Sequence, residues 1–194
     1  MVTVTDLDRR RVSSYKAKSK IEAGIRAAES IEDFLTGLDI NVFIQPLSSS
    51  NIDRAAQLCA KTNQFNTTSK RYNESDLYQL EADGHQVFVV GMEDTFSEKE
   101  NIGLLVLKSN GDQSGIVDLF LLSCRVLGRG IDAAVLEWCI SRASSLGWGM
   151  IYGEVLETDR NTPVRGTFLE NGFRKSDSKN IWVRDDMFSK PPAF

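Results

Sequence analysis

Histidine, cysteine and proline are scarce in this sequence, which contains one histidine, three cysteines and four prolines in 194 residues. No His/Cys or carboxylate spacing suggests a metal site, and no Ser-His-Asp order for a catalytic triad is available. An odd number of cysteines does not suit a disulfide framework and is typical of a protein in a reducing compartment. We therefore expect a cytoplasmic protein that binds no metal ion.

An excess of one charge and a long apolar run are also missing. Lysine and arginine total 23 against 27 aspartates and glutamates, so the net charge is −4. A mildly acidic chain is poorly suited to nucleic acid or to anionic membranes. No apolar run approaches the roughly 20 residues that cross a bilayer. Charged residues between Asp6 and Arg11 stand where a signal peptide would have its apolar core. We expect neither a nucleic-acid nor a membrane partner.

The composition is that of an ordinary globular protein, with 41% hydrophobic and 26% charged residues, and the length suits one large domain. Residues 1–40 differ from the rest because they are polar and rich in lysine, arginine and alanine. Thr5 and Asp8 have the spacing of a capping box, which favours a helix. We therefore predict a helical arm or linker from a missing upstream domain over 1–40 and one domain over 41–194.

From residue 41 onward, the apolar pattern alternates between the periods of strands and helices. It predicts strands at 42–47, 86–92, 102–108, 115–123, 149–155 and 181–184, and helices at 51–61, 74–82, 131–146 and 163–170. The strands from 86 to 123 are close enough in sequence to form an antiparallel meander. The expected fold class is α/β (α+β), with a mixed, mostly antiparallel sheet flanked by helices.

The stretch from Leu122 to Gly130 contains the pattern Arg-x-x-Gly-x-Gly between a predicted strand and a predicted helix. Glycines let backbone amides face a ligand, and a helix N-terminus leaves N–H groups unpaired. Arginines in the same loop add charged donors. The combination predicts a cradle for a phosphate or diphosphate. The alternative is a turn that only links two elements. The candidate binding residues are Leu122, Arg125, Val126, Gly128, Arg129 and Gly130.

This pattern resembles the glycine-rich motif of the GNAT acetyltransferases, which holds the diphosphate of coenzyme A. The stretch from Asn161 to Phe173 is similar to that family's second signature, with an Asn early in a helix and Gly-Phe at its end. The resemblance implies a GNAT fold and a CoA or phosphopantetheine cofactor, with Asn161 as a further binding residue. A helix cap is the alternative for Asn161. Phe168 departs from the family, because it replaces the usual tyrosine acid and cannot donate a proton.

A closer resemblance covers nearly the whole chain. Residues 61–66 (KTNQFN), Arg71-Tyr72 and residues 120–130 (FLLSCRVLGRG) look like the C-terminal half of FkbH-like proteins of polyketide pathways. In those proteins a phosphatase-like N-terminal half takes a phosphoglyceryl unit from bisphosphoglycerate, and a glyceryl group is loaded onto an acyl carrier protein. The resemblance implies an acyltransferase domain whose partners are an acyl carrier protein and a HAD-like phosphatase domain, on the same or another chain.

Cys124 is the candidate nucleophile. It stands at a predicted strand end, beside Arg125 and just before a helix N-terminus, and both features favour the thiolate. A thiolate there would accept an acyl group and pass it to the phosphopantetheine thiol of a carrier protein. The alternative is a buried structural cysteine, which is our interpretation of Cys59 and Cys139 on apolar helix faces.

Two carboxylates are candidate partners of Cys124. If the strand at 149–155 runs parallel to the Cys124 strand, Glu154 emerges near Cys124 as a base or as a partner for a glyceryl hydroxyl. Capping of the next helix is the alternative for Glu154. Asp118 shares the strand face of Cys124 unless a bulge intervenes, and it is a candidate substrate-binding residue. Asp94 is another candidate, because in an antiparallel meander the end of its strand lies near the end of the strand that precedes Cys124.

Amide side chains form a third candidate group. Asn63, Gln64 and Asn66 surround Phe65 in the connection between the first two predicted helices. Amides are neutral donor–acceptor pairs suited to a polyol or to the amides of pantetheine, so these residues are candidate substrate ligands. The alternative is a loop held together by its own side chains.

These observations support three functional hypotheses. The leading one is transfer of a glyceryl or similar small acyl group, through a Cys124 thioester, onto the phosphopantetheine thiol of an acyl carrier protein. The second is a CoA-dependent N-acetyltransferase that lacks the tyrosine acid. The third is a non-catalytic module that docks a carrier protein.

Overall fold

The computed structural model describes residues 37–111 and 113–185, so the arm predicted over 1–40 lies almost entirely outside the described residues. The described part divides into two compact units. The smaller contains residues 37–42 and Met92–Glu100, and the larger contains Phe43–Gly91 and the residues from 101 onward. Within the described ranges, no helix has the length and apolar character needed to cross a bilayer.

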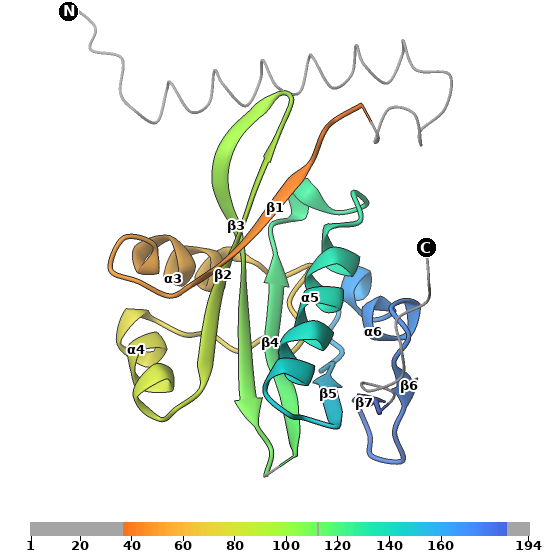
Figure 1. Cartoon of the computed structure of the whole chain (residues 1–194). Helices are drawn as coiled ribbons and strands as arrows, with labels where there is room; N and C mark the ends of the chain where they lie inside the picture. The colour runs from red at the N-terminus through yellow and green to blue at the C-terminus, as the bar shows by residue number, and fades with distance from the viewer. Residues whose placement is uncertain (1–36, 112, 186–194) are drawn as a thin grey trace, which may run out of the picture. The chain divides into compact units, whose positions relative to one another are not determined.

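Seven strands form one sheet in the order β1-β2-β3-β4-β5-β7-β6 (Figure 1). Their bounds are β1 Asn41–Pro46, β2 Gln86–Asp94, β3 Ser97–Ser109, β4 Ser114–Leu122, β5 Met150–Glu154, β6 Arg174–Lys175 and β7 Ile181–Arg184. The pairs β3/β4, β5/β7 and β6/β7 are antiparallel, whereas β4 and β5 run parallel. The predicted mixed, mostly antiparallel sheet is confirmed.

The helices lie close to their predicted positions. Their bounds are α3 Ile52–Lys61, α4 Glu74–Ala82, α5 Ile131–Ser145 and α6 Thr167–Glu170, with short 3₁₀ turns η1 at Cys124–Val126 and η2 at Thr162–Val164. The ends of α4 agree with the prediction because local chemistry fixes its start. The Asp76 N–H donates to Asn73 Oδ1 at 3.0 Å, and the Asn73 N–H donates to Asp76 Oδ2 at 2.9 Å, which is a complete capping box.

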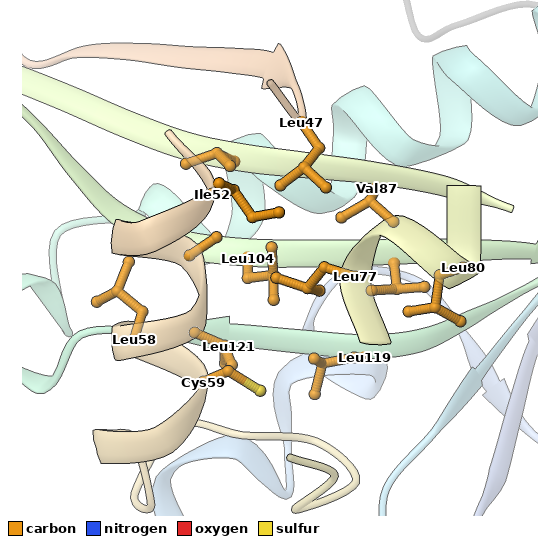
Figure 2. Close-up of a cluster of buried hydrophobic side chains, with 13 residues drawn as sticks. Leu47, Ile52, Leu58, Cys59, Leu77, Leu80, Val87, Leu104, Leu119 and Leu121 are labelled. Carbon is orange, nitrogen blue, oxygen red and sulfur yellow. The ribbon is translucent and has the colours of Figure 1, made fainter. Parts of the chain in front are cut away.

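The core follows from strand alternation, because successive side chains point to opposite faces of the sheet. On one face, residues of α3 and α4 pack against alternate residues of β2, β3 and β4 (Figure 2). That cluster includes Leu58, Leu77, Leu104, Leu119 and Leu121. Cys59 is part of the same cluster, and Cys139 of α5 is also fully buried, so both are core cysteines as predicted. Burial raises the pKa of both thiols.

Two irregularities of β4 shape the site. The register between β3 and β4 slips at Asp118, because Val106 faces Leu119 whereas Leu107 faces Val117, so Asp118 is the extra residue of a bulge. In addition, β4 pairs with β5 only as far as the Val117–Gly153 pair. Beyond that pair, the segment Phe65–Thr68, here called the inserted segment, hydrogen-bonds to β4 in place of β5.

Candidate functional site

The predicted cradle begins where β4 ends. Cys124–Val126 forms a 3₁₀ turn rather than the start of the long helix, and α5 begins after Gly130, which has φ of 72° and provides no side-chain cap. Gly128 has φ of 75°, a conformation that glycine adopts without strain. A Cβ built on either glycine has nothing within 4 Å. The loop is therefore open around these two glycines, directly before the N-terminus of α5.

The candidate residues of this loop differ in accessibility. Cys124, Arg125, Gly128 and Gly130 are exposed, so the interpretation of Cys124 as a buried structural cysteine is wrong. Leu122 and Val126 are buried, and their N–H groups donate to the carbonyls of Phe65 at 3.1 Å and Ser123 at 3.1 Å. These two amides are used within the fold, which leaves the part of the loop around Gly128 and Gly130 as the candidate anion site.

Beyond the Val117–Gly153 pair, β4 and β5 are no longer paired, and we call the space between them the split. The inserted segment fills this split. The Thr67 N–H donates to the Phe120 carbonyl at 3.0 Å, and the Phe120 N–H donates to Thr67 Oγ1 at 3.0 Å. On the other side, the Leu156 N–H donates to the Thr67 carbonyl at 2.8 Å. The ring of Phe65 packs edge-on against Phe120, with centroids 5.3 Å apart. Thr67 therefore connects β4 with the chain that follows β5.

Asn66 and Asn161 hold this segment in place. Both side chains are completely buried. Asn161 Nδ2 donates to the carbonyls of Asn66 at 3.1 Å and Leu156 at 2.9 Å, and its Oδ1 accepts from the Thr158 N–H at 2.8 Å. Asn161 makes no side-chain cap of η2. Asn66 Oδ1 accepts from the Ser69 N–H at 2.8 Å. In this structure both side chains bond to groups of the fold, and their predicted roles as ligand-binding residues stay predictions.

The other two candidate amides lie at the start of the same connection. Asn63 and Gln64 are exposed. Asn63 Oδ1 accepts from the guanidinium of Arg71, which also donates to the carbonyls of Cys59 and Thr62 near the C-terminus of α3. A cation at this end of a helix is favourable because the last carbonyls are otherwise unpaired. The loop is thus held together partly by its own side chains, which was the alternative prediction.

A polar cluster surrounds Asp118, whose side chain is 8% exposed. Lys70 Nζ lies 2.5 Å from Asp118 Oδ1, and Lys108 Nζ lies 3.4 Å from Asp118 Oδ2. The Tyr72 hydroxyl donates to Asp118 Oδ2 at 3.0 Å. Glu154 joins the cluster because its Oε2 lies 3.8 Å from Lys70 Nζ. The bulge at Asp118 thus brings groups from β3, β4, β5 and the α3–α4 connection together.

The cluster shifts the titration of two of its members. Burial alone would raise the pKa of Asp118, but the hydrogen bond and charge of Lys70, the charge of Lys108 and the Tyr72 hydroxyl together hold it below its usual value. Burial, and then the neighbouring Asp118 carboxylate, raises the pKa of Tyr72. The cluster therefore holds an ionised carboxylate beside a protonated phenol at neutral pH.

The register corrects the predicted position of Glu154. The strands β4 and β5 are parallel, as expected, but Gly153 lies opposite Val117, so Glu154 is level with Asp118. Cys124 stands six residues further along the chain, a rise of about 20 Å in an extended strand, and the inserted segment lies between β4 and the chain after Glu154. The structure therefore groups Glu154 with Asp118 and Lys70, and not with Cys124.

Asp94 and Phe168 complete the set of predicted positions. Asp94 belongs to the smaller unit, at the end of β2, where its Oδ1 accepts from the Phe96 N–H at 2.8 Å. Phe168 is completely buried, with its ring 5.1 Å from that of Phe173. A phenylalanine in this position is part of the core and supplies no acid. Among the described residues, no group of three or more His, Cys, Asp or Glu side chains is arranged to hold a metal ion.

The described residues therefore form an α/β domain with a mostly antiparallel sheet and a glycine-rich loop between a strand and a helix. Solved structures with a similar fold include a GNAT family acetyltransferase from Elizabethkingia anophelis with acetyl-CoA bound, which is 12% identical over 75% of this chain and 98% of that chain, with a TM-score of 0.53. An N-acetyltransferase from Staphylococcus aureus is 12% identical over 75% and 98% of the two chains, with a TM-score of 0.54.

A third similar structure is Rv2747 from Mycobacterium tuberculosis in complex with CoA, 15% identical over 70% of this chain and 73% of that chain, with a TM-score of 0.53. The domain therefore has the GNAT acetyltransferase fold. At these identities the likeness extends to the fold alone. No protein-family model matches the chain, and no curated protein matches it.

Proposed function

We propose that this protein is an acyltransferase that takes an acyl group from a CoA thioester and transfers it to an amine. The observation that carries the proposal is the open loop at Gly128–Gly130 where β4 leads into α5, in a domain with the GNAT fold. Two of the three similar structures described above contain CoA or acetyl-CoA. An N-terminus of a 15-residue helix without a side-chain cap is well suited to a diphosphate.

The residues of the loop fit coenzyme A. Gly128 and Gly130 are exposed, and the space that a Cβ would fill at each is open, which suits a close approach of a phosphate to their backbone. Arg125 and Arg129 provide positive charge in the same loop. The amides of the first turn of α5 would hold the diphosphate. When bound, acyl-CoA supplies a thioester carbonyl that is activated toward an amine nucleophile.

The acceptor side of the proposed site is the Asp118 cluster. Glu154 is the proposed base, because its side chain is 25% exposed and its ion pair with Lys70, at 3.8 Å, is longer than that of Asp118 at 2.5 Å. Asp118 is less suited to this role, since its carboxylate is already engaged by two lysines and a tyrosine. Phe168 supplies no proton to the leaving thiolate, so another group must donate it. The proposed donor is the hydroxyl of Tyr72, a phenol like that of the tyrosine that Phe168 replaces.

A second candidate function rests on the exposed thiol of Cys124. In this reaction, the Cys124 thiolate attacks a glyceryl thioester and the donor thiol leaves, and the phosphopantetheine thiol of an acyl carrier protein then takes the glyceryl group from Cys124. Each step exchanges one thioester for another and needs no oxidant or metal. The similarity to the C-terminal half of FkbH-like proteins favours this reaction, but Glu154 is not placed to assist Cys124.

Turnover separates the two functions. The wild-type protein, Glu154→Gln and Cys124→Ser are incubated with acetyl-CoA and a panel of primary amines, and released CoA is measured. For an amine acetyltransferase we expect turnover that falls at least tenfold in Glu154→Gln and is unchanged in Cys124→Ser. A glyceryl–protein adduct, formed from a glyceryl carrier protein and absent in Cys124→Ser, would instead establish the second function. Neither turnover nor adduct, in protein that binds CoA, would reject both.

A further inference from the structure

The edge of β4 that faces the split lies directly before the proposed diphosphate site. The backbone groups of Phe120 and the N–H of Leu122 point into the split, since they bond to the inserted segment rather than to β3. Leu122 is followed after one residue by the 3₁₀ turn that opens the glycine loop. A ligand whose diphosphate is held by that loop therefore begins at the end of this strand edge.

The pantetheine arm of CoA has the chemistry of a short peptide strand. It is an extended chain with two amide groups, and between the diphosphate and the sulfur it is about as long as four residues of a strand, roughly 14 Å. An extended chain with amides gains most by pairing with a free sheet edge, as in β-strand addition. Four residues back from Ser123 the arm reaches Leu119, next to the Asp118 cluster that forms the proposed acceptor side.

In this structure the same edge is already paired. The Phe65 carbonyl accepts from the Leu122 N–H at 3.1 Å, and the backbone and hydroxyl of Thr67 occupy both backbone groups of Phe120. The Thr68 hydroxyl donates to the Asp118 carbonyl at 3.0 Å. The inserted segment and the pantetheine arm of a donor therefore compete for the same hydrogen-bonding groups.

We infer that Phe65–Thr68 is a built-in competitor of the acyl donor, and that CoA binding requires this segment to leave the β4 edge. The inference rests on the proposed function. The residues that flank the segment allow a local opening, because Arg71 fixes the end of α3 through the carbonyls of Cys59 and Thr62, and Lys70 is held by Asp118. Only the residues between these two anchors need to move, and opening breaks their bonds to β4, to Leu156 and to Asn161.

Competition by the inserted segment lowers the apparent affinity for CoA. Only those molecules in which the segment has left the β4 edge can bind the pantetheine arm. A substitution that weakens the closed segment then strengthens CoA binding, although it destabilises the protein. A fall in stability together with a rise in CoA affinity is not expected for a residue that only stabilises the fold. Substitution of such a residue would weaken CoA binding or leave it unchanged.

Thr67→Val tests this competition. Valine keeps the shape of threonine but loses the hydroxyl that accepts from the Phe120 N–H. We expect the dissociation constant for CoA, measured by calorimetry, to fall about fivefold, the effect of one net hydrogen bond on the closed state. Binding of adenosine 3′,5′-bisphosphate, which keeps the first 5′-phosphate but lacks the second phosphate and the arm, should not change. Thr67→Ser, which keeps the hydroxyl, should bind CoA like the wild type.

Ser114→Ala is the matched control, because it removes a buried hydroxyl that donates to the Asn110 carbonyl at 2.6 Å, at the other end of β4. It should lower stability without changing CoA affinity. In the wild type, CoA should also increase hydrogen exchange of peptides that contain residues 65–68, whereas adenosine 3′,5′-bisphosphate should not. This second measurement needs no variant and holds even if Thr67→Val does not fold.

The outcomes separate this inference from the proposed function. If the wild type binds CoA but Thr67→Val binds it no more tightly, and exchange at 65–68 is unchanged or slowed, competition by the segment is rejected and the proposed function stands. If neither CoA nor adenosine 3′,5′-bisphosphate binds the wild type or Thr67→Val, the proposed function fails and the inference fails with it.

Discussion

The ammonium of Lys70 lies 2.5 Å from Oδ1 of Asp118, a carboxylate that sits on a bulge of β4 and is almost completely buried. Lys108 and the hydroxyl of Tyr72 occupy the other carboxylate oxygen. A buried charge with this many partners is stable only while it stays ionised. The cluster is therefore a source of pH dependence in the folded protein.

The lowered pKa of Asp118 predicts loss of stability in acid. Its pKa in the unfolded chain is about 3.9, so the stabilisation is present above that pH and disappears as the pH falls through the lower folded value. We expect Asp118→Asn to lose about 2 kcal/mol at pH 7 and to differ less from the wild type near pH 3. Urea unfolding at both pH values measures this difference. Asp83→Asn, at an exposed carboxylate, is the control, and an equal deficit at both pH values would contradict the assignment.

The three cysteines should differ in reactivity. Cys124 is exposed, whereas Cys59 and Cys139 are buried. We expect iodoacetamide to modify one thiol in the native protein and all three after denaturation, with Cys124→Ser unmodified in the native state. Peptide mass spectrometry identifies the site. Native modification of Cys59 or Cys139, or none at Cys124, would contradict the structure.

Substitution of Asn161 distinguishes a role of this residue in folding from a role in cofactor binding. Asn161→Ala removes three hydrogen bonds from a completely buried site. We expect a loss of about 2–3 kcal/mol in the free energy of unfolding, measured by urea denaturation, and little change in affinity for adenosine 3′,5′-bisphosphate. Normal stability with lost nucleotide binding would instead favour the ligand role that the family signature implies.

Gly130→Ala tests the loop. Its φ of 72° is strained for alanine by about 1–2 kcal/mol, so the substitution should distort the N-terminus of α5 and weaken CoA binding at least fivefold. Gly84→Ala is a matched control, because Gly84 has φ of 82° and equally open space but lies between α4 and β2. Calorimetry with CoA and thermal unfolding of both variants make the comparison. Equal CoA affinity in the two variants would exclude the loop as the binding site.

Local signals explain what the sequence predicts well. The capping box at Asn73 and Asp76 gives the start of α4, and the apolar period from Ile131 gives α5. The two-residue strand β6 at Arg174–Lys175 has no such period and was missed. The glycine loop is recognisable because its pattern is continuous in sequence, whereas the 3₁₀ turn at Cys124–Val126 carries no pattern that predicts it.

Long-range pairing explains what was missed. The hydrogen bond between Thr67 and Phe120 joins residues 53 positions apart, and no local pattern reveals it. A short run with two threonines, which favour extended backbone, was the only signal for the inserted segment. Glu154 was misplaced because parallel direction alone does not fix register. The burial of Asn161 is not visible in the sequence, because an asparagine that hydrogen-bonds within the fold looks the same there as one that binds a cofactor.

The most direct test of the account is amide chemical-shift mapping of the ¹⁵N-labelled protein during titration with CoA. We predict saturable shifts at Gly128, Gly130 and the first turn of α5, together with changes at Phe65–Thr68, while adenosine 3′,5′-bisphosphate shifts only the loop and α5. Saturable shifts confined to other parts of the chain, or no shifts at millimolar CoA, would contradict the assignment of this loop as the site of the acyl donor.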